Sequence, residues 1–262
     1  KCVVCQKNEK PKAVKKLSNL SDSNLSRAQQ AQKYFTLGAW TSELGPSAQA
    51  RTYLLKSIDL GIPQKAHAHY LIASTYRQEK DFISAVLHYT RSFEENPPLN
   101  IFFQSRLDYA DMAIEMKQYK KALDNLMYVE RRQRGDYRYP EIVWKLIGVE
   151  MKMGRKLQAC RWARKMYSSF PGHPLAKDWG VDLHLNKYEG ESTGCVVSMK
   201  DMRYRNRRLM LAGDEQKAKK EIDELISRIK PADHFEIDVM RAEFLQAQGY
   251  PDEALKLLAK HY

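Results

Sequence analysis

A pattern of small, aromatic and proline residues recurs along this chain with a period of about 36 residues. The clearest copy covers residues 66–97, where Ala73 and Ala85 are separated by twelve positions and Pro97 closes the unit. This spacing predicts two short amphipathic helices that cross where a small side chain lets their axes approach closely. A unit of this length cannot bury its apolar face alone, so it must stack on its neighbours.

The pattern recurs on both sides of the clearest copy. In the fourth copy Gly148 pairs with Cys160, although a register shifted by one residue, with Gly154 and Ala159, also fits. Asn206 is the exception among the middle small residues, because all the others are glycine or alanine. The middle residues of the successive copies are Gly38, Ala73, Ala110, Gly148, Asn206 and Ala242.

These features resemble the tetratricopeptide repeat family over residues 27–262, apart from one insertion. The resemblance is closest over residues 66–97, fair over residues 98–134 and 235–261, and weak elsewhere. It implies an all-α fold, a right-handed superhelical solenoid of stacked antiparallel helix pairs, which binds partners and rarely catalyses a reaction. The alternative is an irregular helical domain without true repeats.

We expect four parts along the chain. Residues 1–20 are rich in lysine and are expected to form an N-terminal basic tether, and residues 21–170 are expected to form TPR-like helical repeats. Residues 171–200 are expected to form an irregular insertion or bend, because the small residues at positions 148 and 206 are 58 positions apart. Residues 201–262 are expected to form the C-terminal TPR-like repeats.

The net charge of +12 predicts attraction to polyanions, such as nucleic acid, anionic lipid, acidic protein or an acidic cell-wall polymer. The alternative is a solvated basic surface without a specific partner. The two densest basic clusters are residues 131–134 and 203–208. On a helix the second cluster spreads around most of the circumference, which disfavours a nucleic-acid-binding helix. The sequence contains no apolar run long enough to span a membrane.

The four cysteines leave two alternatives open. Cys2 and Cys5 form a CxxC motif, but the sequence has no second pair at similar spacing, so we predict no metal site and no cofactor. In an oxidising compartment Cys2 could bond Cys5, and Cys160 could bond Cys195. In a reducing compartment Cys160 would be a small residue at a helix crossing.

We find no motif of known catalytic function and predict no catalytic residue. Residues 171–176 and 207–213 weakly resemble the helical superhelix of soluble lytic murein transglycosylases. In that family a glutamate followed by serine is the general acid/base, but here only the dipeptide Glu191-Ser192 matches. The resemblance therefore implies a non-catalytic accessory domain, with a periplasmic or envelope location favoured over the cytoplasm.

The tetratricopeptide resemblance further implies that ligands lie in an inner groove lined by the first helix of each pair. The predicted groove residues are His67, Tyr70, Ser74, Arg77, Gln78, Gln104, Asp111, Lys145, Lys152, Arg203 and Arg207. The same register also places Leu107 and Val149 there.

We expect this groove to bind a protein or peptide segment. Two alternatives remain: an acidic cell-wall glycopeptide bound by an accessory domain of a lytic transglycosylase, and nucleic acid, which is disfavoured. Leu255, Leu257 and Leu258 lie in the last predicted helix, which has a neighbouring unit on one side only. We expect its other side to be covered by a further segment, another subunit or a partner, or else to be exposed.

Overall fold

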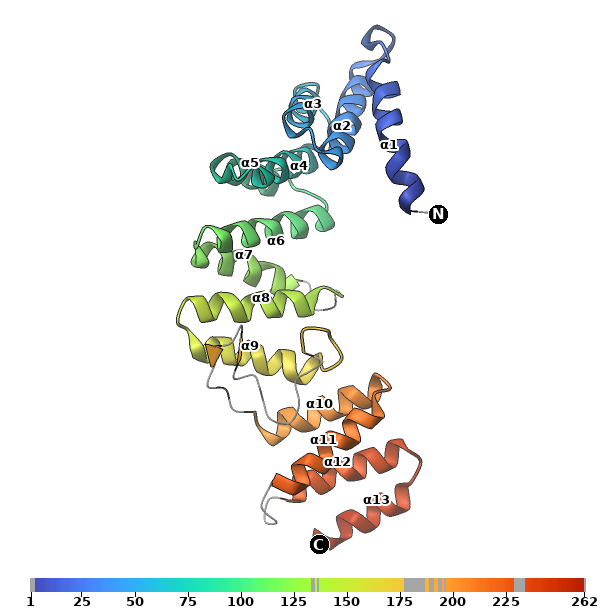
Figure 1. The fold of residues 1–262 in the computed structure, drawn as a ribbon, viewed down its shortest axis with the longest axis vertical. Helices are drawn as coiled ribbons and strands as arrows, with labels where there is room; N and C mark the ends of the chain where they lie inside the picture. The colour runs from blue at the N-terminus through green and yellow to red at the C-terminus, as the bar shows by residue number, and fades with distance from the viewer. Residues whose placement is uncertain are drawn as a thin grey trace. The chain divides into compact units, whose positions relative to one another are not determined.

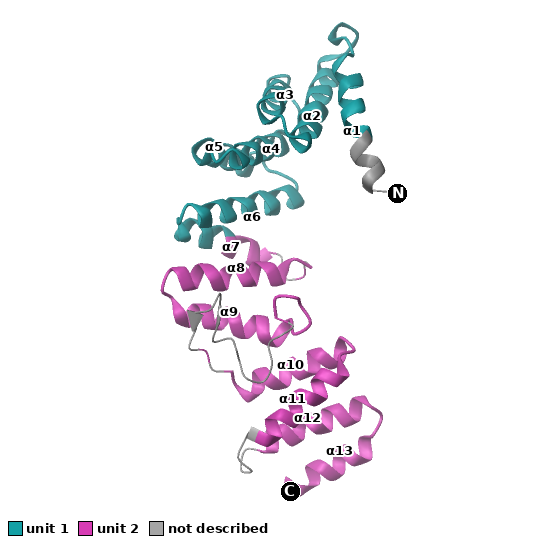
Figure 2. Ribbon diagram, viewed as in Figure 1, with its two compact units in different colours: residues 1–125 teal, residues 126–262 magenta. Residues whose placement is uncertain are grey.

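The computed structural model of the chain describes residues 3–132, 135, 137–176, 187–188, 191–192, 195, 197–228 and 234–261. These residues are almost entirely α-helical (Figure 1). The chain divides into two compact units, residues 1–125 and residues 126–262 (Figure 2). Each unit consists of successive antiparallel helix pairs, as the repeat predicts.

Unit 1 begins with a single helix and a 3-10 turn, which helix pairs follow. Helices α2 and α3 form one pair, α4 and α5 form the next, and α6 continues into the following pair. The bounds are α1 Val3–Ser18, the 3-10 turn η1 Asp22–Asn24, α2 Arg27–Leu44, α3 Ser47–Asp59, α4 Lys65–Gln78, α5 Phe82–Glu94 and α6 Leu99–Glu115.

Helix α7, Tyr119–Arg132, begins in unit 1 and ends in unit 2. Within unit 2, α8 packs on α9, α9 on α10, α10 on α11 and α12, and α12 on α13. The bounds are α8 Tyr139–Lys152, α9 Lys156–Ser169, β1 Lys187–Tyr188, β2 Glu191–Ser192, α10 Met199–Leu211, α11 Glu215–Arg228, α12 His234–Ala247, α13 Pro251–Leu258 and the 3-10 turn η4 Ala259–His261.

Small residues lie where the paired helices cross, as predicted. Ala73 of α4, Ala85 of α5, Ala110 of α6 and Ala122 of α7 are all completely buried. In the first pair, a Cβ atom added at Gly38 would lie only 2.5 Å from Leu54 Cγ of the partner helix. The absence of a side chain therefore sets how closely two helices of a pair approach.

The fourth pair, α8 and α9, follows the shifted register only in α9, because Gly154 is exposed beyond α8 and Gly148 is the buried small residue of that helix. Ala159 is completely buried, whereas Cys160 is only half-buried, so Ala159 is the crossing residue in α9. Cys160 is displaced from the crossing and forms a disulfide with Cys195, the pairing expected in an oxidising compartment. Cys2 lies outside the described residues, and its predicted bond to Cys5 stays a prediction.

The N-terminal segment differs from the predicted tether. Val3–Ser18 form helix α1, and Lys10 of this helix forms an ion pair with Glu43 of α2. The segment is helical because lysine, alanine and glutamate are good helix formers, and Pro11 removes only one intrahelical donor.

The predicted insertion, residues 171–200, includes a short antiparallel hairpin. Strand β1 pairs with β2 through Lys187 opposite Ser192 and Tyr188 opposite Glu191. The described remainder of this segment is irregular, except that α10 begins at Met199, and Cys195 is tied to α9 by the disulfide.

A buried histidine pair joins α4 to α5 in unit 1. The Nδ1 atoms of His69 and His88 lie 3.0 Å apart, so one ring donates and the other accepts. Tyr76 stacks on the ring of His88. His67, two positions from His69, lies instead against Phe35 of α2, so the two histidines face different sides of α4 as predicted.

We predict that Gly38→Val destabilises the chain by about 1–3 kcal/mol, because the added atoms overlap Leu54 and the backbone of α3. Gly172→Val is the matched control, since a Cβ atom there has no atom within 4 Å. Thermal unfolding followed by circular dichroism measures both. Equal midpoints for the two variants would contradict the close-approach argument.

We predict that the stability of unit 1 falls as the pH drops from about 6.5 to about 4. Burial, and then the neighbouring His69 and Arg91, lower the pKa of His88 from 6.5 to about 4. Between these values the unfolded chain binds a proton that the folded chain excludes, so acidification favours unfolding by on the order of 1–3 kcal/mol. Urea unfolding at several pH values should show this slope, and His88→Gln should flatten it. An unchanged slope in His88→Gln would refute the assignment.

Candidate functional site

Helix α10 is fixed at its N-terminus by a capping box. The Ser198 side chain accepts a hydrogen bond from the backbone N–H of Asp201, and the Asp201 carboxylate accepts one from the backbone N–H of Ser198. The Asp201 carboxylate also forms an ion pair with Arg164 of α9, with Arg164 Nη2 2.6 Å from Asp201 Oδ2. Burial would raise the pKa of Asp201, but the hydrogen bonds from Ser198 and Arg164 hold it below its usual value. The start of α10 is thereby tied to α9.

A completely buried arginine fixes the rotation of α10. Arg205 donates from Nε and Nη2 to the Glu221 carboxylate of α11, with distances of 3.0 Å to Oε2 and Oε1 respectively. Its Nη1 donates to the Tyr167 carbonyl oxygen of α9, and its guanidinium lies over the Tyr167 ring. Arg205 therefore links α9, α10 and α11. Next to it, Asn206 Nδ2 donates across the pair to the Ala218 carbonyl oxygen, 2.8 Å away.

With α10 held in this rotation, Arg203 and Arg207 project towards α12. Both guanidinium groups donate to the same carboxylate, that of Glu243. Arg203 Nη1 also lies 3.7 Å from Glu236 Oε2. Burial would raise the pKa of Glu243, but the hydrogen bonds from Arg207 and Arg203 outweigh it and hold the pKa below its usual value. The two arginines therefore share the half-buried carboxylate of Glu243, and Arg203 also lies near the carboxylate of Glu236.

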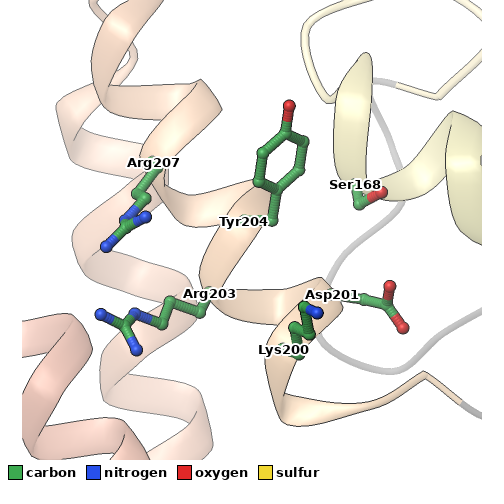
Figure 3. Close-up of a pocket in the computed structure, with 6 residues that line it drawn as sticks. All are labelled: Ser168, Lys200, Asp201, Arg203, Tyr204 and Arg207. Carbon is green, nitrogen blue, oxygen red and sulfur yellow. The ribbon is translucent and has the colours of Figure 1, made fainter.

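A hollow of about 300 Å³ lies beside these arginines (Figure 3). Arg203 and Arg207 extend from α10 in one direction and Asp201 in another, as Figure 3 shows. The exposed Tyr204 ring contributes an aromatic surface, and its hydroxyl accepts a hydrogen bond from Arg208. The lining residues are Ser168, Lys200, Asp201, Arg203, Tyr204 and Arg207, which we call the basic pocket.

The prediction that residues 203–208 do not form a single basic stripe is confirmed. Arg205 is buried in the helix packing, Arg203 and Arg207 face α12, and Arg208 is exposed. Of this cluster, only Arg203, Tyr204 and Arg207 line the basic pocket.

In unit 1 the predicted groove residues surround a half-buried carboxylate on α6. Asp108 accepts hydrogen bonds from Tyr70 Oη at 2.9 Å and from Gln104 Nε2 at 3.1 Å. Arg77 of α4 lies 3.9 Å from Asp108 and forms an ion pair with Glu115 at 2.7 Å. Burial raises the pKa of Asp108 above its usual value, although the hydrogen bonds from Tyr70 and Gln104 act to lower it. These polar groups satisfy one another across α4 and α6.

The structure places the other predicted groove residues as follows. His67, Ser74 and Asp111 are half-buried and Gln78 is exposed in unit 1. Lys145, half-buried, and Lys152, exposed, lie on α8 in unit 2 and do not line the basic pocket. That the predicted residues together line one groove stays a prediction.

The same register also predicted that Leu107 and Val149 face the solvent in the groove. This prediction is wrong, because helix packing buries both side chains. Lys200, Tyr204 and Asp108 were missed. Lys200 lies three residues before Arg203, so helical periodicity could have identified it. The half-burial of Asp108 depends on packing between helices and had no sequence signal.

Within the described ranges, no three histidine, cysteine, aspartate or glutamate side chains gather in a way that could hold a metal ion. Among the described helices, none has the length and apolar character needed to cross a membrane.

We predict that Glu221→Ala destabilises the chain by about 3–5 kcal/mol, because it leaves the charge of Arg205 buried without its partner. Glu224→Ala is the control on the same helix. Its carboxylate pairs with Lys220, whose side chain is exposed, so we expect a loss of less than about 1 kcal/mol. Chemical denaturation of both variants measures the difference, and similar losses would show that Arg205 is not held by Glu221.

Comparison with protein family models gave no match, and comparison with curated protein sequences gave none either. Solved structures do match. A tetratricopeptide repeat protein from Parabacteroides merdae is 14% identical with a TM-score of 0.52, and the match covers 98% of this chain and 87% of that one. The apo form of RapI is 16% identical with a TM-score of 0.51, covering 96% and 87%.

A third match is the C-terminal part of a TPR repeat-containing protein from Cytophaga hutchinsonii, with 12% identity, a TM-score of 0.51 and coverage of 97% and 90%. At these identities the likeness shows the fold. The weaker resemblance to lytic transglycosylases stays a prediction. Stacked helix pairs, small residues at their crossings and these structural matches together show that the chain has the tetratricopeptide repeat fold.

Proposed function

We propose that this chain is a non-catalytic interaction module that binds a segment of a partner protein at the basic pocket of unit 2. The observation that carries the proposal is the shared carboxylate of Glu243. Arg164, Lys200, Arg203 and Arg207 outnumber the carboxylates around the pocket, those of Glu243, Glu236 and Asp201, so the pocket keeps an excess of positive charge. A carboxylate of a partner would balance that excess.

The pocket favours a polypeptide for two physical reasons. Arginine and tyrosine are enriched at the centres of protein interfaces, and Arg203, Arg207 and Tyr204 lie together here. The arginines are also already ordered by Glu243, so binding loses less side-chain entropy than it would with free arginines. The volume of about 300 Å³ lies at the lower end of ligand sites, roughly 300–1,000 Å³, and suits one or two side chains of a longer segment.

The proposal includes an oxidising compartment, such as a bacterial periplasm or envelope. It is supported by the disulfide between Cys160 and Cys195. The net charge of +12 would increase the rate of encounter with acidic partners there.

Selection of a random dodecapeptide library on the immobilised chain tests the proposal. We predict enriched peptides whose affinity, measured by fluorescence anisotropy, falls about tenfold in the Lys200→Gln/Arg207→Gln double variant, equivalent to ~1.4 kcal/mol. Arg203 is retained in this variant so that Glu243 keeps a partner.

The matched control is Lys156→Gln/Arg161→Gln, which removes two charges from exposed positions on α9. This control should bind the peptides as the unmodified chain does. Failure to enrich any peptide, or equal affinity for both double variants, would rule out the basic pocket as the binding site.

A further inference from the structure

A second hollow, of about 430 Å³, lies between α12 and α13 in unit 2. Most of its lining is apolar, in contrast to the basic pocket. We call it the apolar groove, and its lining residues are Arg203, Val239, Ala242, Glu243, Gln246, Pro251, Ala254, Leu255 and Leu258.

Two leucines of α13 in the apolar groove are open to solvent to different degrees. Leu255 is 67% exposed and Leu258 is half-buried. Behind them, Ala242, Ala254 and Leu257 form a small buried cluster that holds the groove in shape. A preformed apolar surface of this kind gains free energy when an apolar side chain covers it.

Arg203 joins the two hollows, because its side chain lines both of them. Its guanidinium is held between Glu243 and Glu236 of α12, with Nη1 3.7 Å from Glu236 Oε2. Glu243 also lines the apolar groove. The basic pocket and the apolar groove are therefore adjacent parts of one surface, made by α10, α12 and α13.

We infer that this joined surface takes a polypeptide segment that carries a carboxylate and, a few residues away, a large apolar side chain. The inference rests on the proposed function and specifies the chemistry of its ligand. The carboxylate lies at Lys200 and Arg207 in the basic pocket. The apolar side chain lies against Leu255 and Leu258 in the apolar groove, and the backbone between them passes Arg203.

Charge and polarity together select this occupant. A carboxylate alone would use the basic pocket and leave Leu255 in water, and an apolar segment alone would leave the excess positive charge of the basic pocket unbalanced. A polyanion such as nucleic acid has no aliphatic side chain for the apolar groove. A segment with both groups matches both hollows, and each contact makes the other more favourable because the two share one backbone.

The test uses individual peptides from the dodecapeptide selection, resynthesised with a fluorophore. We expect the enriched sequences to share an aspartate or glutamate and a large apolar residue at a constant spacing. Leu255→Gln should weaken binding of such a peptide about tenfold, because a polar side chain replaces the exposed leucine of the groove. Leu157→Gln, at an 82% exposed leucine on α9, is the matched control and should leave binding unchanged.

Changes in the peptide identify which of its groups binds in the basic pocket. Glutamate→glutamine in the peptide should weaken binding about tenfold to the unmodified chain, and should have little further effect on Lys200→Gln/Arg207→Gln, because the two changes remove the same interaction. A version with an amidated C-terminus separates the two sources of the carboxylate. If the amidated peptide still binds, the carboxylate that binds belongs to a side chain. If binding is lost, it is the C-terminal carboxylate, and both results support the inference.

The outcomes separate the inference from the proposed function. Peptides that bind through Lys200 and Arg207 but are insensitive to Leu255→Gln would overturn the inference and leave the proposed function in place. Failure to select any peptide would overturn both. If sedimentation shows that the chain forms a dimer that Leu255→Gln dissociates, the apolar groove binds a second copy of the chain, and the inference is wrong.

Discussion

Every other feature of each unit depends on the close approach of two helices at a residue with almost no side chain. Ala73 and Ala85 lie completely buried at one crossing, and Gly38 leaves no room for even a methyl group at another. When the crossing residue is fixed, helical geometry fixes which side chains of the pair face inwards and which face outwards. The surface that α10 presents is therefore a consequence of packing on its opposite side.

Where the repeat departs from small residues, a hydrogen-bonded polar side chain takes their place. Asn206 occupies a crossing position and donates to the Ala218 carbonyl oxygen of the partner helix. The adjacent Arg205 is satisfied by Glu221 and the Tyr167 carbonyl oxygen. A buried polar group without such partners would destabilise the fold, so these contacts specify how α9, α10 and α11 must be arranged. The same arrangement directs Arg203 and Arg207 to the side of the basic pocket.

The sequence was sufficient to predict the helix pairs because their signal is periodic and local. The crossing residues Ala110 and Ala122 follow directly from the repeat, and the shifted register at Ala159 was one of two alternatives. Helix α1 was missed because it lies outside the repeat. Arg203 and Arg207 were predicted as surface residues, but their shared partner Glu243 lies 36 or more residues away, and a contact between separate pairs has no local pattern. The burial of Arg205 could not be predicted from the sequence either, because a charged side chain is normally expected to be exposed.

The disulfide between Cys160 and Cys195 has a topological consequence for unit 2. It closes a covalent ring that contains the second part of α9 and most of the connection to α10. A protease that cuts the backbone once inside this ring leaves both fragments attached to each other through sulfur. Cleavage there would not change the apparent size of the chain in gel electrophoresis until a thiol reductant is added. Helices α9 and α10 would stay covalently connected after the peptide chain between them had been cut.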